Sequence, residues 1–157
     1  MERVRLVRMG KKTAQDTWKK LQRIIDKDNR YSVQSYQFIF EALDFTASQL
    51  GKKYNSSREE ERHVSGQELS EGIKRYALMK FGFMTRTVFD LWGITNSGDF
   101  GEIVFNLVES GLMGRTESDS IDDFRNLYDF QTEFEDKFEF DGNFDLSYSW
   151  NLYGKKE

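Results

Sequence analysis

The chain has 157 residues, 38% of them apolar and 15% aromatic, which suits one domain with a packed core rather than two independent domains. Cysteine is absent and histidine occurs once, which excludes disulfides and thiolate ligands and argues against zinc or iron sites. No stretch approaches the roughly 18 uninterrupted apolar residues of a membrane-spanning helix, and the N-terminus lacks a signal-peptide core, so we expect a cytoplasmic protein.

The net charge of −4 hides a gradient along the chain. Residues 1–30 contain ten Lys or Arg against four Asp or Glu, whereas residues 117–157 contain four against twelve. Two interpretations remain open. The ends attract each other or are simply solvated, or the basic head binds nucleic acid or another acidic surface.

The head begins with an arginine-rich segment. Residues 3–8 suit either a short strand or an arm that becomes ordered on a partner. Thr13 is a plausible N-cap for the first helix. Spacings of three and four predict that one face of this helix is buried, and that face contains Trp18, Leu21, Ile24 and Ile25. The basic residues proposed as nucleic-acid contacts are Arg3, Arg5, Arg8, Lys11, Lys12, Lys19, Lys20 and Arg23.

A second, longer helix is predicted from Ser32 to about Leu50, with Gly51 as its end. Its apolar residues keep a spacing of four and three, which is typical of a core-facing seam. The seam consists of Tyr36, Phe40, Leu43, Ala47 and Leu50, widened by Ile39. The polar, mixed-charge stretch 52–62 then predicts a loop.

Three shorter helices follow, each closed by a glycine. Ser65 and Glu68 have the spacing of a capping box, which starts the first of them. The buried stripe predicted for this helix contains Leu69, Ile73, Tyr76 and Ala77. The second runs from about Met84 to Trp92 with Val88, Leu91 and Trp92 inward, and the third has an apolar face of Phe100, Ile103, Val104, Leu107 and Val108.

Beyond Gly114 we expect a hairpin, with strands at 115–116 and 127–130 and a polar tip between them. Three helices followed by a hairpin is the order of a winged helix. Phe130, Phe134 and Phe138 then recur every fourth residue, which predicts a helix with one aromatic face. The alternating apolar residues of 146–152 predict a strand, with residues 3–8 as its candidate pairing partner.

The sequence thus predicts a mainly α protein with a small β-hairpin. Residues 1–30 form a basic arm and first helix, and residues 31–130 form a single helical domain whose winged-helix-like part is 62–130. Residues 131–157 form an acidic, aromatic tail packed on the domain or extending it.

Several segments between residues 31 and 130 resemble one family. They are RHVSGQELSEGIKRYALMKFG, TVFDLWGI, DFGEIVFNLVESGLM and DSIDDFRNLYDF. They are similar to a family of conserved hypothetical proteins of planctomycete and verrucomicrobium-type bacteria. The resemblance covers about two thirds of the chain. It implies no activity and no catalytic residue.

A winged helix suggests DNA binding through its third helix. Here that helix contains Asp99, Glu102 and Glu109 and no Lys or Arg, and the expected hairpin is also acidic. Because duplex DNA is densely charged, such a surface would repel it. Any contact with nucleic acid is therefore expected from the basic head.

The residues do not predict an enzyme, because no nucleophile and base, carboxylate pair or phosphate-binding loop stands out. His63 is either a pH-sensitive group or, more in keeping with its place before a helix, a structural hydrogen-bonding group.

We therefore expect a non-enzymatic protein-interaction module with no metal and no cofactor, whose partner is another protein or a second copy. Four aromatic residues are candidates for the contact if they are exposed, and cover the core otherwise: Phe134, Phe138, Tyr148 and Trp150. The alternative is a nucleic-acid-binding or ribonucleoprotein-associated protein, such as a transcriptional regulator.

Overall fold

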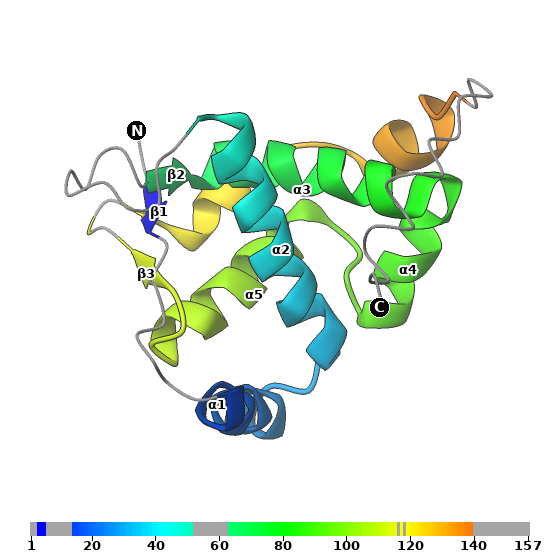
Figure 1. The fold of residues 1–157 in the computed structure, drawn as a ribbon. Coiled ribbons are helices and arrows are strands. Elements are labelled where there is room, and N and C mark those ends of the chain that lie inside the picture. The colour runs from blue at the N-terminus through cyan, green and yellow to red at the C-terminus, as the bar shows by residue number, and fades with distance from the viewer. Residues whose placement is uncertain (1–2, 6–13, 52–62, 116, 118, 140–157) are drawn as a thin grey trace, which may run out of the picture.

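A computed structural model of the chain describes residues 3–5, 14–51, 63–115, 117 and 119–139, and within them the protein is mainly helical, as predicted (Figure 1). The helices are α1 (Ala14–Lys27), α2 (Val33–Gln49), α3 (Gly66–Phe81), α4 (Thr85–Trp92) and α5 (Ser97–Glu109). The short helical turns are η2 (Gly82–Met84), η3 (Ile121–Phe124) and η4 (Thr132–Asp136). The strands are β1 (Arg3–Arg5), β2 (His63–Ser65) and β3 (Gly114–Arg115). The loop predicted for 52–62 and the strand predicted for 146–152 lie outside the described residues.

Helix α2 is the centre of the core. It contacts α1, α3, α4 and α5, and Figure 1 shows it crossing the middle of the molecule. Four residues of its predicted seam are fully buried: Tyr36, Ile39, Leu43 and Ala47. Phe40 is only half-buried, and Leu50 is exposed because α2 already ends at Gln49. Phe38, which the seam did not include, is buried instead.

An aromatic cluster joins α2, α4, α5, η4 and the segment just before η4. At its centre is Phe89, which is fully buried. The centroid of its ring lies between 5.4 and 5.7 Å from the rings of Phe38, Phe100, Phe130 and Phe134. Three of these contacts, with Phe38, Phe100 and Phe134, are edge-on, a geometry that aromatic pairs prefer.

The capping box predicted at Ser65 and Glu68 is confirmed. The Ser65 hydroxyl accepts a hydrogen bond from the Glu68 N–H at 3.0 Å, and the Glu68 carboxylate accepts one from the Ser65 N–H at 2.8 Å, so the capping box begins α3. Helix α5 starts after Asn96, whose N–H donates to the Asp99 carboxylate at 3.2 Å. Gly93 ends α4 with φ +86°, and a Cβ there would collide with the carbonyl oxygen of Arg30. Only glycine suits that position.

The sheet differs from the prediction. It has three antiparallel strands in the order β2, β1, β3, with Val4 opposite Val64 on one side and Arg115 on the other. The strand alternative for the arginine-rich head is therefore confirmed at residues 3–5. The predicted hairpin is wrong, because residues 114–115 pair with β1 rather than with 127–130.

A short helical turn replaces the hairpin tip. Ser120 and Asp123 form a second capping box, in which the Asp123 carboxylate accepts from the Ser120 N–H at 2.9 Å and starts η3. Phe124, at the end of that turn, is fully buried, and η3 packs extensively along α5. A local cap and a buried aromatic side chain thus favour a helical turn where the sequence analysis expected the tip of a hairpin.

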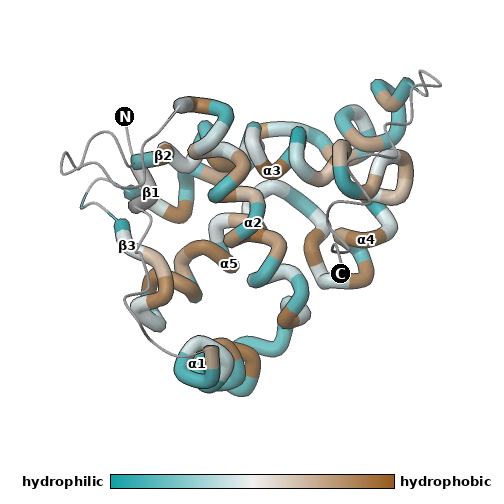
Figure 2. The backbone as a smooth tube through the Cα atoms, in the orientation of Figure 1, coloured by the Kyte–Doolittle hydropathy of each residue, from teal (hydrophilic) through white to brown (hydrophobic). Residues whose placement is uncertain are grey.

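Two residues predicted to face inward are exposed. Trp18 is 54% exposed, because α1 packs through Leu21 and Ile24 and has few contacts with α2. Leu91 is 79% exposed, because α4 turns Thr85 and Phe89 toward the core instead. Figure 2 shows hydrophobic segments on α4 as well as on the central α5.

Candidate functional site

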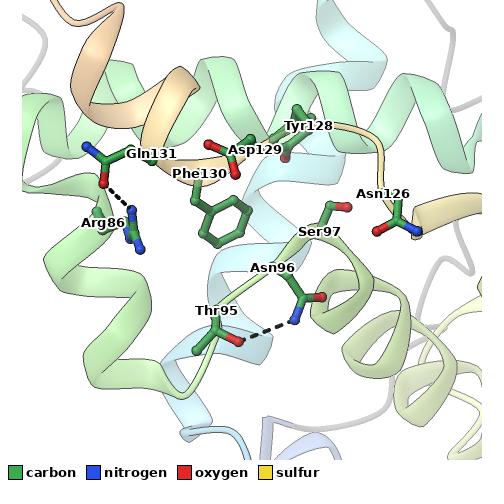
Figure 3. Close-up of a pocket in the computed structure, with 9 residues that line it drawn as sticks. All are labelled: Arg86, Thr95, Asn96, Ser97, Asn126, Tyr128, Asp129, Phe130 and Gln131. Atoms are coloured by element: carbon green, nitrogen blue, oxygen red, sulfur yellow. Dashed lines mark hydrogen bonds between the residues drawn. The ribbon is translucent and has the colours of Figure 1, made fainter.

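A polar cleft opens beside the start of α5 (Figure 3). It has a volume of about 380 Å³ and lies between α4, the residues before α5 and the segment 126–131. Its lining consists of Arg86, Thr95, Asn96, Ser97, Asn126, Tyr128, Asp129, Phe130 and Gln131. Asn126 adopts φ +52°, a conformation that few residues other than glycine take.

Three polar side chains of this cleft, Arg86, Tyr128 and Asp129, have hydrogen-bond partners within the protein. Arg86 donates to the Gln131 side chain at 3.1 Å, and its guanidinium lies 3.8 Å from the Glu135 carboxylate. The Asp129 carboxylate accepts the Thr132 N–H at 2.9 Å, which lowers its pKa. Tyr128 donates its hydroxyl to the Ser70 carbonyl at 3.0 Å, and burial raises its pKa well above the ordinary value. These shifts favour the neutral form of the Tyr128 phenol and the ionised form of the Asp129 carboxylate.

A second polar cleft of about 320 Å³ continues from the first across the start of α5, sharing Asn96 and Asn126. It adds two more arginines, but each faces a carboxylate. Arg30 binds Asp28 at 2.7 Å and Glu102 at 3.2 Å, and Arg125 binds Asp122 at 2.9 Å. An incoming anion would therefore have to displace existing partners.

A third cleft of about 450 Å³ separates α1 from the end of α5, and it brings together two of the basic residues predicted to bind nucleic acid, Lys20 and Arg23. The Lys20 ammonium lies near Gly111, just beyond α5, and Lys27 lies 3.9 Å from Glu109. Cations at a helix C-terminus are stabilised by its partial negative charge. Lys20 and Lys27 of α1 thus lie where the C-terminus of α5 favours a positive charge.

None of the other predicted basic contacts that the structure describes lines this cleft. Lys19 is exposed on α1. Arg3 and Arg5 belong to β1, and Arg8, Lys11 and Lys12 lie outside the described residues. His63 is buried in β2, opposite Arg5. The structure therefore brings only part of the predicted basic surface together.

Helix α5 is not presented to solvent as a recognition helix. Its apolar residues are in the core, and η3 and α2 pack along it. Its acidic residues have partners: Asp99 accepts the Tyr31 hydroxyl at 2.6 Å, Glu102 binds Arg30, and Glu109 lies near Lys27. Burial and the Asp99 carboxylate raise the pKa of Tyr31, which keeps it a donor.

The aromatic residues predicted to contact a partner divide into three groups. Phe134 is fully buried in the aromatic cluster, so it has no surface to offer. Phe138 is half-buried, and its ring lies 6.3 Å from that of Phe83. Tyr148 and Trp150 lie outside the described residues.

The most prominent exposed apolar side chains are ones that the sequence analysis missed. Phe83 is 62% exposed, Met84 42% and Leu91 79%, and the half-buried Val88 lies between them on α4. We call these four residues the η2–α4 apolar surface. The sequence does contain a signal for it. Thr85, Phe89 and Trp92 form one stripe with spacings of four and three, and Met84, Val88 and Leu91 form a second stripe with the same spacings. A helix with two apolar stripes can bury only one of them in its own core.

Comparison with known proteins adds no identification: no protein-family model, curated protein or solved structure matches the chain. The resemblance to a conserved hypothetical family stays a prediction. Among the residues that the structure describes, no group of His, Cys, Asp or Glu is arranged to hold a metal ion. In the same part of the chain no helix has the length and apolar character needed to cross a membrane.

Proposed function

We propose that this protein is a non-enzymatic interaction module that binds a partner polypeptide through the η2–α4 apolar surface. The observation that carries the proposal is the exposure of Leu91, 79%, on the same stripe as Met84 and next to Phe83. Exposing several large apolar side chains on one short helix and the turn before it is unfavourable unless another surface covers them. Aromatic, leucine and methionine side chains are also well suited to packing against varied partners.

The spacing of the stripe indicates the kind of partner. Met84, Val88 and Leu91 lie four and three residues apart, so they form a ridge of about two turns along α4. Such a ridge packs into the groove of another helix. We therefore expect the partner to contribute an amphipathic helix whose apolar face covers α4.

The test is a comparison of variants in one binding assay. The tagged wild-type chain is first used for affinity capture from the native cells, and the protein that it recovers in stoichiometric amounts is purified. The wild-type chain and its Leu91→Asp and Gln22→Asp variants are then compared for binding of that purified protein. Gln22 is exposed on α1 and serves as the control. We expect Leu91→Asp to weaken binding of that purified protein at least tenfold and Gln22→Asp to leave it unchanged. Equal binding by the two variants would refute the proposal.

Nucleic-acid binding through the basic head is the second candidate, and one observation favours it. Trp18 is 54% exposed on α1, next to Lys19, and an exposed aromatic ring beside cations can stack on an unpaired base. In this alternative the successive α3, α4 and α5 are a winged-helix-like core that carries the head. Binding of mixed-sequence single-stranded RNA that falls steeply with salt and is lost in Trp18→Ala would support it; no binding at low salt would remove it.

A further inference from the structure

The chain emerges from its last described turn beside the η2–α4 apolar surface. Turn η4 contacts both η2 and α4. Phe138, just after η4, packs its ring against that of Phe83 at 6.3 Å between centroids, and the same ring lies 3.8 Å from where a Cβ on Gly82 would be. Phe138 therefore extends the apolar surface next to residue 139, the last that the structure describes.

Residues 140–157 follow directly, and their sequence is rich in large apolar side chains. Leu146, Tyr148, Trp150 and Leu152 occur at every second position, after Phe140 and Phe144. An eight-residue helix such as α4 is about 12 Å long. Ten residues of extended chain reach up to about 33 Å. Residues 144–152 can thus reach every part of the surface from their attachment at residue 139.

We propose that residues 144–152 of the same chain occupy the η2–α4 apolar surface and compete with the external partner. The competition with a partner rests on the proposed function, whereas the binding of residues 144–152 to the surface does not depend on it. Attachment beside the surface gives the segment an effective concentration in the millimolar range, so modest apolar contacts are sufficient. A partner must displace it, and the segment therefore sets a threshold for binding.

Disulfide trapping in the purified full chain tests the occupancy without any partner. Because the natural chain has no cysteine, an introduced pair is unambiguous. The test pair is Thr87→Cys, exposed on α4, with Ser149→Cys between Tyr148 and Trp150. The control pair is Gln22→Cys with Ser149→Cys, since Figure 1 places α1 apart from α4.

We expect the test pair to close into an intrachain disulfide at least tenfold faster than the control pair under mild oxidation, and Trp150→Ala to remove most of that advantage. Equal rates for the two pairs would overturn the inference. So would a test pair that yields mainly disulfide-linked dimers, which would assign the surface to a second copy. Wild-type and Trp150→Ala chains are then compared for partner binding, where we expect the variant to bind at least threefold more tightly. Fast trapping with no partner bound would refute the proposed function alone.

Discussion

Gly72 in α3 faces Thr46 in α2 at a distance that leaves no room for a side chain. A Cβ on Gly72 would overlap the hydroxyl and the methyl group of Thr46, and both residues are buried. The Thr46 hydroxyl is fixed by a hydrogen bond of 2.6 Å to the Ala42 carbonyl, so it cannot easily turn away. The contact sets the separation of α2 and α3 in the core.

Gly72→Ala is therefore expected to lower the free energy of unfolding by about 1–3 kcal/mol, although alanine is intrinsically the better helix former. Chemical denaturation followed by circular dichroism measures the difference. Gly98→Ala in α5 is the matched control, because its Cβ would meet only the ends of flexible side chains such as Asn96. A Gly72→Ala protein as stable as wild type would show that the two helices are not in this close contact.

Asp28 links the end of α1 to α5. Its carboxylate accepts from Arg30 at 2.7 and 2.9 Å and from Asn106 at 3.0 Å, and the Arg30 hydrogen bond is the main reason that the pKa of Asp28 lies far below 3.8. A lowered pKa in the folded state contributes stability above the unfolded value, and that contribution is lost as the pH falls through the folded one. We expect wild type to lose stability progressively below about pH 4.

Asp28→Asn should destabilise the protein by about 1–3 kcal/mol near pH 7, because it removes charge-assisted hydrogen bonds. The difference from wild type should shrink as the pH falls from about 4 toward 2. Denaturant titrations at several pH values measure it, with Asp26→Asn, an exposed residue of α1, as the control. A difference that stays constant with pH would contradict the ion pair.

Leu91→Asp should leave the fold intact. Because the side chain is 79% exposed, we expect the free energy of unfolding to change by no more than about 0.5 kcal/mol. Phe89 lies in the same helix but is fully buried, so Phe89→Ala should lower the free energy of unfolding by about 3–5 kcal/mol. Thermal unfolding of the two variants separates these outcomes, and a large loss in Leu91→Asp would mean that Leu91 belongs to the core.

Duplex DNA should bind poorly through α5. The helix is covered by η3 and α2, and its carboxylates are paired. We expect Glu102→Lys to leave the affinity for duplex DNA unchanged at low salt. If α5 instead entered a groove of the duplex, the added cation would strengthen binding measurably. Fluorescence anisotropy with a mixed-sequence duplex makes the comparison, and a large gain would contradict the packing of α5.

Local signals predicted the helices well. The box of Ser65 and Glu68 and the stop at Gly93 depend on neighbouring residues, so the sequence suffices to place them. The sheet could not be predicted in the same way, because Val4 pairs with residues about 60 and 110 positions away. The sequences of such short strands do not indicate which distant strand each one pairs with. The inward face of α4 was also mistaken. Its two apolar stripes are equivalent in sequence, and only the aromatic cluster around Phe89 decides between them.

The most direct measurement of the central claim is site-specific photo-crosslinking of the full chain in its native cells. A benzophenone amino acid replaces Leu91 in one protein and Gln22 in the other. We expect one discrete intermolecular adduct from position 91, mapping to an amphipathic helix of the captured protein, and no intermolecular adduct from position 22. The same diffuse products from both positions, or no intermolecular adduct at position 91, would contradict it.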